Sequence, residues 1–227
     1  EDVVKSSAIE GEYLNVQSVR SSLARRLGVD IGTLAPVDRH VEGIVEMALD
    51  ATQQYTQPLS QERLYAWHAA LFPTAYSGLQ KILVAQYRDD SQGPMQVVSL
   101  TKNQQHIHFQ APPAECLVEQ MKRFLHWLNN DNESNPFIKA GIAHLWFLTL
   151  HPFDYGNGRI GRAIIDYFLA RADNLGQRYY SMSAQIQANR SSYYETLELT
   201  QKEGMDITQW LLWFLNTLAQ AMQKAID

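Results

Sequence analysis

The sequence has little of several features that would place it in a special class of protein. Cys116 is the single cysteine among 227 residues, which excludes an internal disulfide framework and is typical of a reducing compartment. Acidic residues outnumber basic ones by 24 to 19, and a net charge of −5 offers no basic surface for nucleic acid. The sequence has no run of eighteen apolar residues, as a transmembrane helix would need. Its N-terminus does not show the charged stretch followed by an apolar stretch that is typical of a signal peptide. We therefore expect a cytoplasmic protein that binds neither membranes nor nucleic acid.

What the sequence does have is enough apolar material for one substantial core, since 45% of its residues are hydrophobic. There is no internal repeat and no low-complexity stretch. The chain starts at Glu1 rather than at a methionine, so we expect it to be a fragment of a longer protein.

Helical periodicity dominates and predicts a mainly α fold. Apolar residues recur at intervals of three and four, so that they fall on one helix face. The segments with this spacing are 41–48, 117–128, 159–171 and 207–218.

The best-defined helix is predicted over residues 137–150, because this segment is apolar nearly all round, as in a helix at the centre of a bundle. Asn135 is the expected N-cap and Pro136 the first helical residue. For the last helix, Asp206 is the expected N-cap, with Gln209 three residues further on.

One part of the chain is predicted to be a β-hairpin. Residues 96–99 and 106–109 are short runs of β-prone residues, and the polar stretch 100–105 joins them.

The segment from His151 to Arg162 carries the strongest functional signal. It reads His-Pro-Phe-Asp-Tyr-Gly-Asn-Gly-Arg-Ile-Gly-Arg, a histidine followed by a tight turn that opens into a helix. Backbone N–H groups at a glycine-rich helix start bind anions, and Arg159 and Arg162, three residues apart, can fork onto phosphate oxygens. Histidine is the side chain best suited to act as a base near neutral pH. This pattern predicts a transferase that splits a nucleotide phosphate and moves part of it to an acceptor.

The same segment resembles the signature of the Fic family (filamentation induced by cAMP), His-x-Phe-x-Asp/Glu-Gly-Asn-Gly-Arg-x-x-Arg. Seven of the eight defined positions match. The resemblance implies a helical bundle with one β-hairpin flap, and an activity that transfers AMP from ATP to a protein. It also implies roles for the matching residues. His151 would be the base, Gly156, Asn157 and Gly158 would hold the α- and β-phosphates, Arg159 the β-phosphate and Arg162 the γ-phosphate.

A second resemblance lies near the N-terminus. Ser6 to Gly11 reads Ser-Ser-Ala-Ile-Glu-Gly and is similar to the inhibitory motif Ser/Thr-x-x-x-Glu-Gly/Asn of many Fic proteins. It implies that Ser6 and Glu10 restrain Arg162 and misplace the γ-phosphate. We therefore divide the chain into an inhibitory motif and helix at 1–28 and a Fic core with its C-terminal helices at 29–227. The alternative is an ordinary capped helix with a solvated Glu10.

The resemblance assigns three further residues to the nucleotide and three to the flap. Tyr193 and Tyr194 match a tyrosine pair beside the adenine, although ordinary aromatic packing would also explain them. Gln201 stands where relatives often have an asparagine near the nucleotide. The flap residues that would hold the target are Val97, Val98 and Ser99.

The position of Tyr155 departs from the signature. The family has an acid there that ligates Mg²⁺, and a phenol is a poor ligand for a hard cation. Asp154, one residue earlier, is the candidate replacement for binding Mg²⁺ or Mn²⁺. If it does not replace the acid, metal-assisted transfer would be slow, or the substrate would not be a triphosphate.

Two pairs of histidines are candidate metal ligands. His106 and His108 share a strand face, but no third ligand is evident in the sequence, so we expect them to decorate the flap. His144 and His151 are two helical turns apart, too far for one metal, and His144 is expected to be a core residue.

The favoured function is protein adenylylation, in which ATP is the substrate and the partner is a protein hydroxyl of Ser, Thr or Tyr, the chain's own included. Two alternatives stay open. One is a different reaction on the same scaffold, either removal of AMP or transfer of another phosphate-linked group. The other is a catalytically weak nucleotide-binding regulatory module. A homodimer is also left open, and the sequence does not identify the target.

Overall fold

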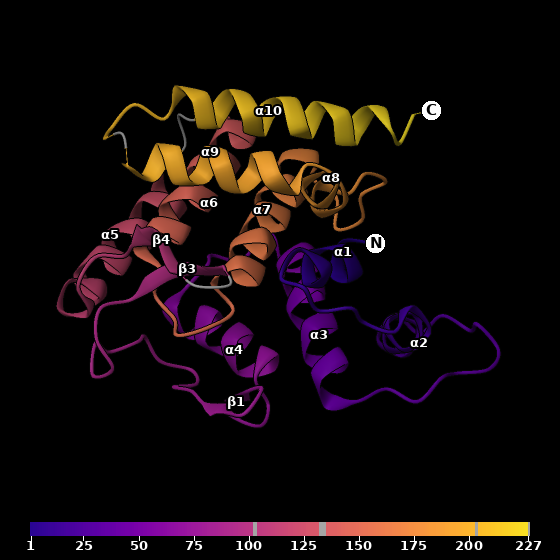
Figure 1. Cartoon of the computed structure of the whole chain (residues 1–227). Helices are drawn as coiled ribbons and strands as arrows, with labels where there is room; N and C mark the ends of the chain where they lie inside the picture. Colours follow the sequence, from indigo (N-terminus) through magenta and orange to yellow (C-terminus); the bar gives the residue numbers. More distant parts are fainter. Residues whose placement is uncertain (102–103, 132–134, 203, 227) are drawn as a thin grey trace.

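The helices α6 (Pro136–Leu150) and α7 (Asn157–Asp173) pack against each other in the middle of the molecule (Figure 1). The computed structural model describes residues 1–101, 104–131, 135–202 and 204–226. The other elements, in chain order, are α1 (Asp2–Ile9), α2 (Val16–Leu27), α3 (Arg39–Gln53), α4 (Gln61–Leu71), β1 (Tyr76–Ser77), β2 (Gln80–Lys81), β3 (Gln96–Thr101), β4 (Gln104–Gln110), the 3-10 turn η1 (Ala114–Cys116), α5 (Leu117–Asn130), α8 (Met182–Ala188), α9 (Arg190–Lys202) and α10 (Thr208–Gln223). The prediction of a mainly α fold is confirmed.

The central helix α6 begins as predicted. The side chain of Asn135 accepts a hydrogen bond from the backbone N–H of Phe137 at 3.0 Å, and Pro136 occupies the first helical position. Most of its residues are buried, because α5, α7 and α10 pack around it. This helix ends at Leu150 and delivers His151 to the centre of the molecule.

The predicted start of the next helix was wrong by two residues. Helix α7 begins at Asn157 rather than at Arg159, since Gly156 takes the left-handed conformation (φ 82°) and turns the chain directly into the helix. Asn157 and Gly158 therefore belong to its first turn. The helix packs against α3 and α6, and α10 covers α6, α8 and α9 on the other side of the bundle (Figure 1).

The expected hairpin is present but differs in its bounds. Strands β3 and β4 pair antiparallel, with Gln96 opposite Gln110 and an irregularity between Val97 and Val98. The strands extend into the stretch 100–105 that we predicted to be the connection, and residues 102–103 of it lie outside the described residues.

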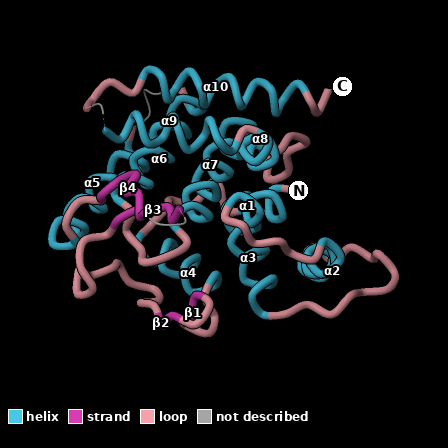
Figure 2. The backbone as a smooth tube through the Cα atoms, viewed as in Figure 1, coloured by secondary structure: helices cyan, strands magenta, loops and turns pink. Residues whose placement is uncertain are grey.

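A second hairpin, β1–β2, was not predicted. Its strands have two residues each, which is too short for any alternation of apolar and polar residues to show in the sequence (Figure 2). The prediction of a single hairpin is therefore wrong.

The N-terminal region folds as two helices with different ends. Helix α1 stops at a turn in which Gly11 is left-handed (φ 81°), and the N–H groups of Gly11 and Glu12 return to the carbonyls of Ala8 and Ser7. This pattern of two return bonds around a glycine is the Schellman motif. As a result, the chain reverses at Gly11 and Glu12 is carried back toward the core.

The last helix starts later than predicted. Asp206 is not its N-cap, because the Asp206 carboxylate accepts a hydrogen bond from the N–H of Thr208, two residues on, and forms a local turn before the helix. Helix α10 begins at Thr208, and its buried side is centred on Trp210, Phe214 and Leu218. Among the helices of the described residues, none is long and apolar enough to cross a bilayer.

Candidate active site

His151 stands at the C-terminal end of α6 in a backbone conformation that non-glycine residues seldom adopt. Its φ is 48°, and its N–H donates to the carbonyl of Phe147. Such a conformation costs on the order of 1–3 kcal/mol and persists only where the surroundings enforce it.

Hydrogen bonds from Arg88 hold His151 in this conformation. Its Nε donates to the His151 carbonyl at 2.8 Å, its backbone N–H donates to the Pro152 carbonyl at 2.9 Å, and its guanidinium also bonds Asp90 at 2.6 Å. The side chain is fully buried. The sequence analysis missed this residue, since a lone arginine in a loop gives no signal of its own.

The imidazole of His151 is arranged to accept a proton. Its Nδ1 lies 3.3 Å from the carbonyl of Leu148, so this nitrogen carries the hydrogen and leaves Nε2 as the basic atom. Burial lowers the pKa of His151 to about 4, and the nearby Arg88 charge acts in the same direction. The ring is therefore neutral at physiological pH.

The turn between His151 and α7 is held by Asn157. The Asn157 side chain accepts from the N–H of Phe153 at 3.0 Å and donates to the carbonyl of the same residue at 2.7 Å. The residue is buried. These two bonds fix the shape of the turn that leads into α7. The phosphate-binding role predicted for Asn157 stays a prediction.

The first turn of α7 faces a cavity without a side-chain cap. Gly156 is its N-cap, and the first N–H groups of a helix have no partner within the helix. A Cβ on Gly158 would lie 2.2 Å from Glu10 Oε1, so the carboxylate of Glu10 rests directly on this glycine. An anion thus already occupies the positive end of α7, and it comes from α1.

Arg162 binds the same carboxylate. Its Nη2 donates to Glu10 Oε1 at 2.7 Å and to the Ser6 carbonyl at 3.0 Å, while its Nε donates to Ser6 Oγ at 2.8 Å. The guanidinium is 1% exposed, and its Nη1 is buried without a hydrogen-bond partner. The structure brings Ser6, Glu10 and Arg162 together as the sequence motifs predicted.

Arg159 is held by a glutamate that the sequence analysis missed. Its Nη1 donates to Glu12 Oε2 at 2.9 Å, and the other oxygen of Glu12 bonds His40 Nε2. The hydrogen bond to Glu12 raises the pKa of His40, and the same bond lowers the pKa of Glu12. The reversal of the chain at Gly11 makes this contact possible. Both arginines of the signature are thus paired with glutamates from the N-terminal segment.

Both tyrosines of the pair line a cavity, and Tyr193 is the more deeply buried of the two. Tyr193 is buried and its hydroxyl bonds His144 Nε2 at 2.8 Å, which gives His144 the core role predicted for it. Tyr194 is half-buried and lines the cavity, and so does Gln201, whose amide also donates to Thr149 at 3.2 Å.

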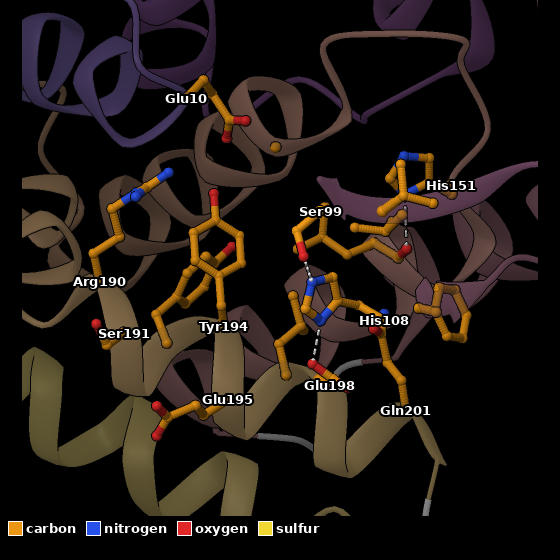
Figure 3. A pocket seen from close by; sticks show the side chains of 17 residues that line it. Glu10, Ser99, His108, His151, Arg190, Ser191, Tyr194, Glu195, Glu198 and Gln201 are labelled. Carbon is orange, nitrogen blue, oxygen red and sulfur yellow. Dashed lines mark hydrogen bonds and ion pairs between the residues drawn. The ribbon is translucent and has the colours of Figure 1, made fainter. Parts of the chain in front are cut away.

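Two neighbouring cavities, of about 590 Å³ and 810 Å³, meet at the candidate base. The smaller one continues past Tyr194 toward Gln201 (Figure 3). The larger one continues past Asp154. Residues that line both are Glu10, Val97, Val98, His151 and Gly158. The flap residues, the base and the anion site therefore share one space.

Asp154 and Tyr155 point to different partners. One oxygen of Asp154 accepts the N–H of Leu83 at 3.1 Å, and the Tyr155 hydroxyl donates to Gln80 of β2 at 2.7 Å. Asp154 thus offers a carboxylate to the larger cavity beside the α7 turn, which Glu10 also lines. Its second oxygen is the type of ligand that Mg²⁺ takes together with phosphate oxygens.

Several known proteins are similar to this chain in sequence or in fold. Residues 58–169 match the model of the Fic/DOC family. Residues 1–29 match a separate family described as a domain of unknown function, DUF4172. Fold neighbours include a Fic family protein from Desulfovibrio desulfuricans G20, with a TM-score of 0.73, 24% identity and coverage of 99% of this chain and 63% of that one. Fic-1 from C. elegans gives a TM-score of 0.64 at 20% identity, with coverage of 99% and 61%.

Among curated proteins, the chain is similar to protein adenylyltransferase Fic of Drosophila mojavensis, at 29% identity over 229 residues. The Drosophila melanogaster protein of the same name is 28% identical over 229 residues. Each alignment covers 99% of this chain but only 40% and 41% of the respective relative. The chain thus spans about two fifths of the length of these relatives.

Proposed function

We propose that this chain is a protein adenylyltransferase, which moves AMP from ATP to a Ser, Thr or Tyr hydroxyl of a protein. The observation that carries this proposal is that His151, neutral and with Nε2 as its basic atom, lines the same cavity as the uncapped start of α7. A base beside an anion site is what transfer at a phosphorus atom requires.

The nucleotide would lie with its adenine beside Tyr194 and its phosphates along the start of α7. The N–H groups from Gly156 to Gly158 would hold the α- and β-phosphates. Arg159 would hold the β-phosphate and Arg162 the γ-phosphate, since a guanidinium forks onto two phosphate oxygens. Tyr193 would support the ring of Tyr194 from the core, and their centroids are 5.0 Å apart.

In the reaction, the target hydroxyl gives its proton to His151 Nε2 while its oxygen attacks the α-phosphorus. The new O–P bond forms as the bond from the α-phosphorus to the bridging oxygen breaks, and pyrophosphate leaves. The N–H groups of the α7 turn would stabilise the charge that develops on the phosphate oxygens. The free carboxylate oxygen of Asp154 would hold Mg²⁺ or Mn²⁺, which supplies positive charge to the phosphates.

The target would dock on the flap. Strand β3 pairs only with β4 among the described strands, so its other edge can take an extended segment of another chain. Val97, Val98 and Ser99 of this strand line the cavity of His151. A hydroxyl-bearing side chain on such a segment would face the base.

The same arrangement carries an inhibitory contact. Glu10 and Ser6 hold the guanidinium that would bind the γ-phosphate, and Glu12 holds the one that would bind the β-phosphate. A nucleotide must displace at least the Glu10 carboxylate to seat its phosphates fully. We therefore propose that the N-terminal segment restrains transfer.

The position of Glu10 also supports a second reaction, removal of AMP from a modified protein. Glu10 and His151 line the same cavities, so the carboxylate can orient a water molecule. That water would attack the phosphorus of the AMP–protein phosphodiester, and the bond from phosphorus to the protein oxygen would break.

Labelling with ATP that carries the label on its α-phosphate, in the presence of Mg²⁺ or Mn²⁺, tests the proposal. The Glu10→Gly protein should label itself, and His151→Ala in that background should lower the rate by about 10²- to 10⁴-fold. The matched control is His126→Ala, an exposed histidine of α5, which should change nothing. Labelling that survives His151→Ala in a folded protein would refute the base, and no labelling in any variant would favour a nucleotide-binding regulatory module.

A separate assay addresses removal of AMP. An AMP-modified protein is supplied and release of AMP is followed. If Glu10 positions the water, Glu10→Gly should lower release while it raises labelling.

A further inference from the structure

A group of metal-binding side chains lies at one end of the smaller cavity, apart from the phosphate turn. His106 and His108 are two residues apart on β4, and Glu198 projects toward them from α9. The Glu198 carboxylate has one oxygen 2.6 Å from His108 Nδ1 and the other 3.7 Å from His106 Nε2. In Figure 3 the ring of His108 lies between Ser99 and Glu198. The structure therefore supplies the third ligand that the sequence did not reveal.

These three side chains match the ligand set of a zinc ion. Their ligand atoms all lie within 4.8 Å of one another. In a tetrahedral site with bonds of about 2.0–2.1 Å, neighbouring ligand atoms are roughly 3.3 Å apart, so small side-chain rotations suffice to enclose an ion. Two imidazoles and one carboxylate form a three-ligand set that leaves the fourth position for water or another oxygen.

The ligand nitrogen of His108 is already oriented. Its Nδ1 donates to the Glu198 carboxylate at 2.6 Å, and its Nε2 lies 2.7 Å from Ser99 Oγ. When an ion takes Nδ1, the ring hydrogen would sit on Nε2 and be donated to the serine. A metal-bound histidine usually has its second nitrogen fixed in this way by a nearby acceptor. Ser99 belongs to β3, and the support thus comes from the partner strand of the hairpin.

An ion pair between His108 and Glu198 does not by itself account for His106, whose ring lies edge-on to that of His108 with centroids 4.6 Å apart. Two imidazoles that converge on one carboxylate are suited to a divalent ion. Lys202, one helical turn along α9, also bonds Glu198 through Oε1 and would compete with the ion for this carboxylate.

We propose that His106, His108 and Glu198 form a binding site for Zn²⁺, which fastens the β3–β4 hairpin to α9. The ion would cross-link β4 and α9, whose ligands His108 and Glu198 are 90 residues apart in the chain. The site lies on the wall of the cavity that holds His151, so a bound ion would fix the distance between the flap and that wall. This inference does not depend on the transfer reaction.

The test is titration of Zn²⁺ alone into the chelator-treated chain, in excess Mg²⁺, by calorimetry. We expect one equivalent to bind in the unaltered chain and in the control His126→Ala. His108→Ala and Glu198→Gln should each weaken binding by more than tenfold, and Ser99→Ala by about 10- to 100-fold, as for other groups that orient a ligand. Lys202→Met should strengthen binding, because the competing cation is gone.

Amide hydrogen exchange provides a second readout that does not depend on the fold of any variant. Zn²⁺ should slow exchange across β3 and β4 of the unaltered chain and leave α2 unchanged. If Zn²⁺ does not bind, or binds equally well to His108→Ala and Glu198→Gln, or leaves the hairpin exchange unchanged, the proposal is overturned.

Discussion

Removal of the Glu10 carboxylate should change ATP affinity and stability in opposite directions, because one guanidinium governs both. In the structure, Arg162 is 1% exposed and pairs with Glu10 at 2.7 Å. Glu10→Gly leaves this guanidinium with its contacts to Ser6 but without the Glu10 carboxylate. In this variant, ATP can bind a guanidinium that Glu10 no longer occupies. It can also bind the start of α7 at Gly158, which Glu10 no longer covers. The chain without nucleotide, by contrast, keeps a buried charge with fewer partners.

The size of the effect follows from burial. Removing one partner of a fully buried pair costs about 3–5 kcal/mol. The Glu10 side chain is 35% exposed, so solvent screening reduces this to about 1–2 kcal/mol. For a domain of this size, 1 kcal/mol corresponds to roughly 2–4 °C in Tm. If the γ-phosphate restores the whole contact, ATP should bind roughly 5- to 30-fold more tightly, since 1.4 kcal/mol is a factor of ten.

Calorimetry measures both quantities on the same samples. The Tm of Glu10→Gly without nucleotide should fall by several degrees on this scale, and ATP titrated into it should show the lower Kd. Glu10→Gln is the matched variant, because it keeps the size and a hydrogen-bond acceptor but loses the charge, and its effects should be intermediate. Combining Glu10→Gly with Arg162→Ala should abolish the gain in affinity, since both changes act on one contact. If Glu10→Gly leaves the Tm and the Kd unchanged, the carboxylate is not a competitor of phosphate.

The remaining predictions concern pH and metal. Because burial lowers the pKa of His151 to about 4, kcat/KM for labelling should stay level through pH 6 and fall only as the pH approaches about 4, and an acid limb near 6.5 would contradict this. The pKa of His40 is raised by Glu12, so the stabilisation from this pair is complete below the unfolded pKa and is lost as the pH rises through the folded one; in denaturant titrations, His40→Ala should cost more stability at about pH 6 than at about pH 9. Tyr155→Asp should raise Mg²⁺-dependent labelling by adding a carboxylate, whereas Asp154→Ala should remove the Mg²⁺ dependence; if Asp154→Ala leaves that dependence intact, the ligand lies elsewhere.

The elements that could be predicted are those whose structure depends on their own residues rather than on contacts with distant segments. Helix α6 could be placed because its apolar residues occupy every face and Asn135 caps it locally. The convergence of Ser6 and Glu10 on Arg162 could be predicted only through the resemblance to a family. Physical patterning alone does not say which of many glutamates meets a guanidinium 152 residues away.

The contacts that the sequence did not reveal join segments that are distant in the chain. Arg88 stabilises the carbonyl of His151 across 63 positions, and no local spacing predicts this. Similarly, Glu198 of α9 comes near His106 and His108 only in the folded chain.

The covalent link between the N-terminal helices and the rest of the chain has a consequence for the restraint proposed for Glu10. Residues 10–15 join α1 to α2, and α2 packs against α3, so the carboxylate of Glu10 stays close to Arg162. A group tethered by a short segment competes at an effective concentration in the millimolar range, whatever the concentration of the protein. Restraint by Glu10 should therefore be unaffected by dilution and should yield as the nucleotide concentration rises. A free peptide that covers residues 2–12, and so includes Glu10, would have to reach a similar millimolar concentration to replace it.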